Sequence, residues 1–309
     1  MKKILLSALI PALAVTAQAQ DGFQTPAVVV DKEGGYSQVW VTAATKTAFR
    51  YKVTEVSTET EDKKFADVAT VYFLEPPAMS KAIDLMENRK YAEAKEAFGR
   101  IKDACKPVIS AQGNPGTLAA FYEMECMRST GDLEGLSAAL KDFVKDPLIN
   151  DIHLRQVDLY VLWDGVRTKS WDRLVILAEQ QSKNPLGPGQ RAQVAYCGGL
   201  AMENLDKPDE ALIAFSTAMT ADAGESDYVA REAALRVLAI HSADEEVKRA
   251  ITNWGTKDEN KNSRGYNDLI EAAAVAELFE KTLGGGAPLP DEYKKLLKYR
   301  VKQAAAGDA

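Results

Sequence analysis

One short pattern occurs twice in this chain and constrains its fold more than any other feature. Residues 88–101 and 206–218 each run from a turn into the sequence x-x-Glu-Ala, with an aromatic residue four positions later and a smaller apolar residue after three more. Positions three and four apart share one face of a helix, so the pattern predicts the packed face of a helix that recurs along the chain. The residues at these positions are Ala94, Phe98 and Ile101 in the first copy and Ala211, Phe215 and Ala218 in the second.

Three weaker copies complete the series, at Gly131–Leu136, Ser170–Leu174 and Asp244–Val247. A single helical hairpin cannot bury its apolar face alone, so a series of this kind indicates hairpins that stack on their neighbours. The equivalent positions are Ala94, Leu136, Leu174, Ala211 and Val247, with successive spacings of 42, 38, 37 and 36 residues.

The two strong copies resemble the second helix of a tetratricopeptide (TPR) motif, whose repeat is about 34 residues. In that family a small residue near the start of this helix lets two helices approach, and the aromatic residue fills the gap between neighbouring motifs. Gly199 stands in the preceding helix, where the family has a small residue at the crossing. The resemblance covers residues 78–254, is specific in two copies and loose in three, and leaves a helical-hairpin array of another family as the alternative. The packing residues that it implies are Ala94, Phe98, Gly199, Ala211, Phe215 and Ala218.

The chain before Pro76 differs from the rest in composition and in hydrophobic pattern, which predict a small β module at residues 20–75. Val, Thr, Tyr and Phe are frequent there and alternate with polar residues, as in half-buried strands. Four strands are expected, with residues 57–64 as a polar loop, and they suggest a small barrel or a curled sheet. The expected strands are Ala27–Val30, Tyr36–Thr45, Phe49–Val53 and Val68–Leu74.

Residues 76–309 are helical in pattern, since apolar residues recur at intervals of three and four between short breaks rich in Gly, Pro and Asn. We expect about five hairpins, closed by capping helices at Ser263–Leu283 and Asp291–Gln303. The expected fold class is therefore mainly α, a TPR-like solenoid preceded by a small all-β module.

Residues 1–19 have the features of a secretory signal peptide. Two lysines precede the apolar run Ile4–Val15, and Ala17–Ala19 supplies small residues ahead of a cleavage site. That run is too short to span a bilayer as a stable helix, and no later apolar run is long enough. We therefore expect cleavage after Ala19 and a periplasmic or secreted protein with no transmembrane segment.

Composition argues against nucleic acid and against catalysis. The formal net charge is −7, which is unfavourable for binding phosphates. The chain has only two histidines; we expect His153 to be exposed in the first turn of a helix and His241 to lie at a helix C-terminus. The sequence contains no nucleophile, phosphate-loop or metal-ligand motif. The expectation is no enzymatic activity, no cofactor and no metal.

The cysteines Cys105, Cys126 and Cys197 are scattered and odd in number, unlike a disulfide framework. We expect Cys105, near the end of one helix, to face Gly116–Leu118 on the next, antiparallel helix. Cys126 lies further along that helix by an offset on the order of 12 Å, which is beyond the reach of a disulfide. The three are interpreted as small buried hydrophobic residues.

A binding role would use the first helix of each hairpin, which lines the concave face in TPR-like arrays. These helices carry aromatic and arginine residues, the usual energetic anchors of protein interfaces. Packing between helices is the alternative for the aromatic residues, among which we single out Tyr160, Trp163 and Tyr196. The full candidate set is Tyr122, Arg128, Tyr160, Trp163, Arg167, Tyr196, Glu203 and Asn204.

These features lead to one main functional hypothesis, a non-catalytic adaptor or scaffold outside the cytoplasm that binds another envelope protein or a peptide through the groove. One alternative is self-association into a structural envelope assembly, through an open β edge or an end of the solenoid. The other is a carbohydrate- or cell-wall-binding module, since aromatic rings also stack on sugars.

Overall fold

The computed structural model describes residues 23–221 and 227–300, so the expected signal peptide and its cleavage site lie outside the described residues. The chain divides into two compact units. Unit 1 combines the chain up to Cys126 with Ala139–Leu154, and unit 2 combines Met127–Ala138 with the chain from Arg155 onward. The boundary expected at residue 75 does not coincide with this division.

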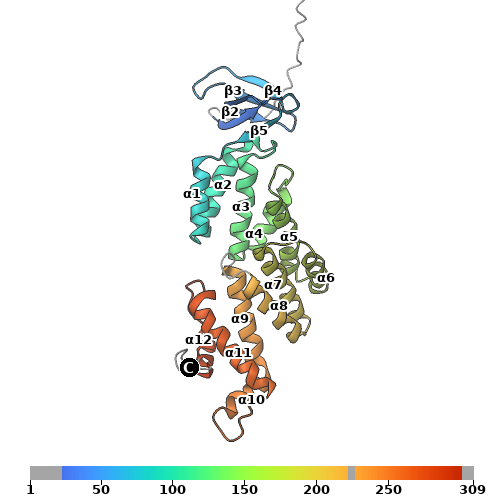
Figure 1. Cartoon of the computed structure of the whole chain (residues 1–309), viewed down its shortest axis with the longest axis vertical. Coiled ribbons are helices and arrows are strands. Elements are labelled where there is room, and N and C mark those ends of the chain that lie inside the picture. Colours follow the sequence, from blue (N-terminus) through green and yellow to red (C-terminus); the bar gives the residue numbers. More distant parts are fainter. Residues whose placement is uncertain (1–22, 222–226, 301–309) are drawn as a thin grey trace, which may run out of the picture. The chain divides into compact units, whose positions relative to one another are not determined.

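Unit 1 begins with a five-stranded, wholly antiparallel sheet in the order β4-β3-β2-β1-β5 (Figure 1). The order ends at β4 and β5, so the sheet is open, and the barrel alternative is wrong. The strands are β1 (Thr25–Val30), β2 (Tyr36–Ala44), β3 (Ala48–Lys52), β4 (Glu61–Lys64) and β5 (Thr70–Phe73).

Strand β4 corrects the expectation of a polar loop at residues 57–64. Its sequence, Glu-Asp-Lys-Lys, has no apolar face, and it is held by cross-strand contacts with β3. Arg50 and Asp62 form an ion pair of 2.9 Å, and the Tyr51 hydroxyl donates to Glu61 Oε2 at 2.6 Å. Charged residues on an edge strand discourage pairing with another chain, which fits the position of β4.

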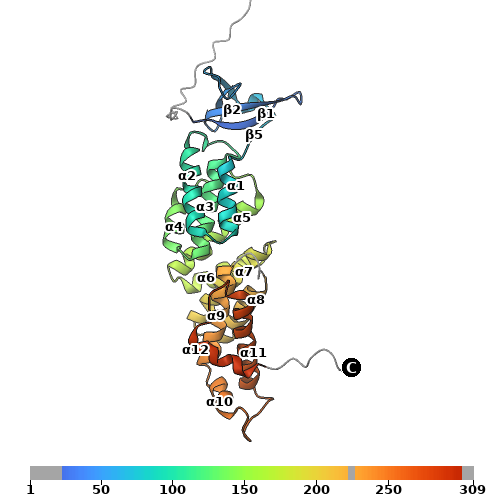
Figure 2. The same ribbon diagram turned by 90° about the vertical axis from the view of Figure 1, so that its left-hand side faces the viewer.

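The inner face of the sheet shares one core with the first hairpin, formed by α1 (Pro77–Glu87) and α2 (Tyr91–Ala104). Val29, Val41 and Phe49 from the sheet belong to the same buried cluster as Met79 of α1 and Phe98 of α2. Figure 2 shows the sheet against the ends of these helices. The β module is therefore packed on the helical array and has no separate core.

The described residues contain twelve α-helices, ten of which form five successive hairpins, so the expected mainly-α fold with a small β module ahead of it is confirmed. The later hairpins are α3 (Pro115–Thr130) with α4 (Leu133–Asp142), α5 (Asp151–Arg167) with α6 (Trp171–Ser182), α7 (Pro188–Asn204) with α8 (Pro208–Ala221), and α9 (Asp227–Ala243) with α10 (Glu245–Asn253). No helix in the described ranges is both long enough and apolar enough to cross a membrane.

The turns of the first four hairpins repeat more strictly than the sequence does. In each, a residue of positive φ lies one or two positions after the end of the first helix and five positions before the recurring packing position: Arg89 (63°), Gly131 (74°), Lys169 (54°) and Asp206 (59°). In each, the next N–H bonds to the carbonyl five residues back, as in a Schellman motif. The four bonds run from Lys90 to Leu85, from Asp132 to Met127, from Ser170 to Gly165 and from Lys207 to Met202, at 2.9–3.0 Å.

The recurring positions are all buried near the start of the second helix of their hairpin. They are Ala94, Leu136, Leu174, Ala211 and Val247, each at most 2% exposed. Two helices of one hairpin approach closely in unit 2, where a Cβ on Gly199 of α7 would lie 2.7 Å from Cε1 of Phe215 on α8. Ala211, Phe215 and Ala218 are fully buried at this crossing.

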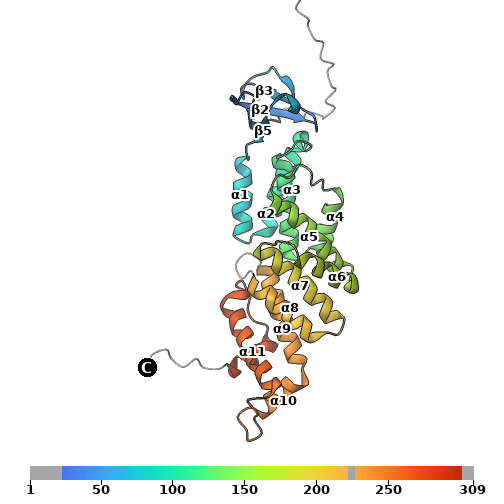
Figure 3. The ribbon, with the colours of Figure 1, turned by 45° about the vertical axis from the view of Figure 1, so that its right-hand side comes forward.

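The C-terminal part of unit 2 covers the last hairpin. Helix α11 (Arg264–Leu278) packs against α9 and α10, and continues as a π-helical turn, Phe279–Leu283 (Figure 3). A short α12 (Asp291–Lys294) and a 3-10 turn, Lys295–Tyr299, follow. Trp254 stacks on Tyr266 of α11, with ring centroids 5.3 Å apart.

Candidate partner-binding site

The three aromatic residues singled out from the first helices are buried in unit 2. Tyr160 and Trp163 of α5 are 1% exposed, and Tyr196 of α7 is 4% exposed. The Tyr196 ring lies 5.9 Å from both the Trp163 and the Phe215 rings, between centroids. This corrects the expectation that they line an open groove, because their surfaces are already covered by neighbouring helices.

A buried amide pair explains how polar groups are accommodated beside these rings. The side-chain amides of Gln156 and Gln193 bond to each other at 2.9 and 3.1 Å, and Trp163 Nε1 donates to Gln193 Oε1 at 3.0 Å. Both glutamines are at most 6% exposed. Their separation equals that of Leu174 and Ala211, so they occupy equivalent positions, a signal that sequence reasoning missed.

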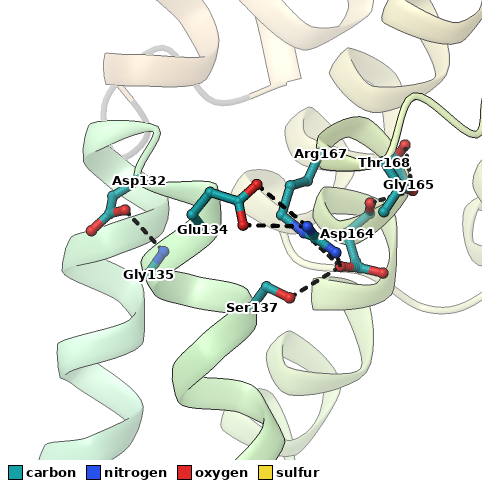
Figure 4. Close-up of polar contacts among 8 residues, drawn as sticks. All are labelled: Asp132, Glu134, Gly135, Ser137, Asp164, Gly165, Arg167 and Thr168. Carbon is teal, nitrogen blue, oxygen red and sulfur yellow. Dashed lines mark hydrogen bonds and ion pairs between the residues drawn. The ribbon is translucent and has the colours of Figure 1, made fainter.

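Arg167 joins the second and third hairpins within unit 2 (Figure 4). Its Nε donates to Asp164 Oδ1 at 2.9 Å, and its Nη1 lies 3.3 Å from both carboxylate oxygens of Glu134. The Ser137 hydroxyl donates to the same Asp164 oxygen at 3.2 Å. These contacts raise the pKa of Arg167, through the bond to Asp164 first and Glu134 second. Its guanidinium is thus engaged between hairpins.

The remaining candidates of unit 2 differ in exposure. Arg128 is 6% exposed, which gives a partner almost no surface to contact. Glu203 Oε1 lies 3.5 Å from Arg236 Nη1, an ion pair with both side chains partly exposed. Asn204 is exposed, but its side-chain amide donates to the Leu200 carbonyl of its own helix at 2.8 Å.

Tyr122 of unit 1 keeps part of its ring exposed. It stacks on Phe98 with centroids 5.2 Å apart and meets His153 edge-on at 5.7 Å. His153 also stacks on Phe121 at 4.5 Å. His153 is therefore half-buried on aromatic rings, which corrects the expectation of an exposed first-turn residue.

The surroundings of Tyr122 are acidic. Burial raises the pKa of Tyr122, and the charges of Glu75, Glu125 and Glu87 add to the rise. Burial lowers the pKa of His153, against the opposing influence of Glu125, so this imidazole is neutral at pH 7. These five residues, here named the Tyr122 patch, come from the segment before α1 and from α1, α3 and α5, and they combine an aromatic surface with negative charge.

A second feature of unit 1 is a cavity of about 710 Å³ beside α3. The Lys102 ammonium and the Glu123 carboxylate, 2.5 Å apart, form an ion pair at its wall. Part of its lining comes from within residues 143–147, which follow α4 and are not helical. The remaining lining residues are Lys46, Lys106, Ile109, Ser110, Gln112, Thr117, Ala120, Met124, Ala139, Asp142, Phe143, Val144, Asp146 and Pro147.

The cysteines are free and buried. A Cβ on Gly116 would lie 2.7 Å from Cβ of Cys105, so Cys105 faces the part of α3 expected from the sequence. Burial raises the pKa of Cys105 to about 11 and also raises that of Cys197. Such thiols are poor nucleophiles, because the reactive species is the thiolate. Within residues 23–221 and 227–300, no three His, Cys, Asp or Glu side chains gather as ligands for one metal ion.

Comparison with known proteins adds no relative. The chain matches no protein-family model, no curated protein and no solved structure at a significant level.

Proposed function

We propose that this chain is an exported, non-catalytic adaptor with a TPR-like array, which binds another envelope protein or a peptide. The four matching Schellman turns and the five buried recurring positions support the TPR-like assignment, because they repeat at hairpins whose sequences have diverged. Arrays of this architecture present extended surfaces for binding. The signal-peptide features of residues 1–19 support export to the periplasm or beyond.

The Tyr122 patch is the observation that carries the binding proposal. Successive first helices of unit 1 contribute to it, and it offers a partly exposed ring whose pKa is raised by the charges of three carboxylates. The cationic side chain of a lysine or arginine in a partner is attracted both to these carboxylates and to the face of the Tyr122 ring. The partner segment that fits best is therefore basic and extended.

Charge reversal tests this proposal without disturbing the core. Glu75 and Glu87 are exposed, so Glu75→Lys combined with Glu87→Lys should leave folding intact. Cross-linking of the mature protein in an envelope fraction, followed by recovery of the bound partner, should fall about tenfold for this variant. The matched control is Glu245→Lys with Glu280→Lys, exposed positions in unit 2 that change the net charge equally. Equal recovery with all three proteins would refute the assignment of the patch.

A carbohydrate-binding role has one observation in its favour. Tyr36, Trp40 and Tyr72 pair across the sheet with Val30, Pro26 and Val28, which alternate on the outer face of β1. Tyr36 is 83% and Tyr72 is 56% exposed. Retention of the protein on insoluble cell-wall polysaccharide, and its loss in Tyr36→Ala with Tyr72→Ala, would favour this function over the adaptor.

A further inference from the structure

A second cavity, of about 570 Å³, lies in unit 2, where α8, α9 and α11 meet. Its charged lining groups are all acidic: Asp209 of α8 and Asp268 and Glu271 of α11. Ser216, Thr217 and Thr220 add hydroxyl groups, while Leu212 and Ile213 supply an apolar wall. An acidic cavity with an apolar side matches a cation attached to an aliphatic chain.

The polar groups of this cavity are mostly hydrogen-bond acceptors. The Thr217 hydroxyl donates to the Ile213 carbonyl at 2.8 Å, and the Thr220 hydroxyl donates to the Ser216 carbonyl at 2.9 Å. Their protons are therefore used within α8, and each oxygen remains able to accept. Ionised carboxylates also only accept. A ligand that fits must donate several hydrogen bonds.

His241 supplies the observation that points to a ligand. It lines the cavity, is 2% exposed, and its Nε2 has no hydrogen-bond partner among the described residues. A buried polar atom without a partner costs on the order of 1–3 kcal/mol, so such atoms commonly mark a missing partner. The unprotonated nitrogen of a neutral imidazole can accept a hydrogen bond from an N–H group of a bound cation.

Arg264 shows that this region already engages one guanidinium. Its Nη2 bonds to Asp244 at 2.6 Å, while its contacts with Asp209 and Asp268 are longer, at 3.8 Å. Arg264 is half-exposed and does not line the cavity. Glu271 has no ion-pair partner within the described ranges. Negative charge thus remains for a ligand.

We propose that this cavity is a binding site for an alkylammonium group, such as a polyamine or the side chain of a lysine presents. The carboxylates and threonine oxygens accept from the ammonium, His241 Nε2 accepts at the buried end, and Leu212 with Ile213 contacts the methylene chain. A bare divalent metal fits less well, since no three ligand side chains in the described part of the chain converge on one point. The site lies in unit 2 and does not depend on the Tyr122 patch.

Calorimetric titration of the mature protein at about 0.15 M salt tests this proposal, with spermidine and a lysine-containing tripeptide as probes. Saturable binding of either is expected; tighter spermidine binding assigns the site to a free polyamine, and tighter peptide binding to a protein side chain. Glu271→Gln should weaken binding about tenfold, as loss of one charge-assisted hydrogen bond implies. Glu280→Gln removes an exposed carboxylate outside the cavity and should leave binding unchanged.

His241→Gln is an independent test of the site, because it removes the imidazole acceptor, whereas Glu271→Gln tests only the contribution of negative charge. It should weaken spermidine binding while leaving the far-ultraviolet circular dichroism spectrum unchanged. Absence of saturable binding of both probes at millimolar concentration overturns the proposal. Equal weakening by Glu280→Gln and Glu271→Gln overturns it as well, since the attraction would then belong to the acidic surface in general.

Discussion

The ring of Phe215 lies so close to Gly199 that a Cβ at position 199 would stand 2.7 Å from Cε1 of the ring. Real carbon atoms do not approach so closely, so α7 and α8 can cross at this distance only with glycine there. Phe215 is fully buried and also contacts Tyr196, with ring centroids 5.9 Å apart. The crossing therefore joins the α7–α8 hairpin to the aromatic cluster beside it.

Gly199→Ala should destabilise the protein by about 1–3 kcal/mol, because the added methyl group forces the Phe215 ring or the helices apart. Phe215→Ala should cost about 3–5 kcal/mol through loss of a buried ring. The control is Gly99→Ala in α2, where the new Cβ would meet only the end of the Glu123 side chain, with Oε1 nearest at 3.4 Å. This control should gain up to about 1 kcal/mol, since alanine favours a helix over glycine. Urea unfolding of the three variants measures the differences; destabilisation by Gly99→Ala as large as that by Gly199→Ala would contradict the crossing geometry.

Tyr196→Ala should destabilise about as much as Phe215→Ala, by about 3–5 kcal/mol. Tyr196 is 4% exposed and lies between Trp163 and Phe215. Tyr36→Ala, at a position that is 83% exposed, is the control and should change the free energy of unfolding by less than about 0.5 kcal/mol. If Tyr196→Ala has only a small effect on the melting temperature, Tyr196 does not belong to the core, and its assignment to the binding surface is supported instead.

The positions of the hairpins could be predicted from the sequence because their turns and packing positions are local. The series of copies places Leu136 and Leu174 correctly although their copies lack the small and aromatic residues, since the position after each turn identifies them even where the residue has changed. Strand β4 could not be predicted, because its four charged residues show no alternation. It is defined by its pairing with the preceding strand β3, as the Arg50–Asp62 ion pair shows.

The burial of the candidate aromatic residues could not be predicted either. Periodicity shows which residues share a helix face, but not whether that face meets solvent or another helix. In α5, buried residues from Gln156 to Gly165 occupy nearly the whole circumference, because helices pack on both sides of it. Tyr122 lies on an equivalent first helix, yet it keeps an exposed edge.

Lys169→Gly should stabilise the protein by up to about 1 kcal/mol. Lys169 has a φ of 54°, in the left-handed region where a side chain is unfavourable and glycine is not. Gly131→Ala at the equivalent turn should do the opposite, because its φ is 74° and the new Cβ would lie 2.8 Å from the Tyr228 hydroxyl oxygen. Chemical unfolding of both variants checks the shared turn; a loss of stability in Lys169→Gly would count against it.

The stability of the protein should fall as the pH drops from 7 toward 5, and His241 should cause much of the fall. Burial lowers the pKa of His241, an effect that outweighs the opposing charges of Glu271, Asp268 and Asp244 and that Arg264 reinforces. Because its folded-state pKa lies below the unfolded value of about 6.5, the unfolded state binds the proton first, and stability present above that pH is lost below it. The carboxylate of Asp209 of α8 lines the same cavity. His241→Gln removes the titrating group, so its free energy of unfolding should vary less with pH over this interval.

His153→Gln is the matched control: the pKa of His153 is also lowered by burial, but in unit 1, so this variant should keep the contribution of His241. Urea unfolding at a series of pH values measures both slopes, and an unchanged slope in His241→Gln would show that folding does not lower the pKa of this imidazole.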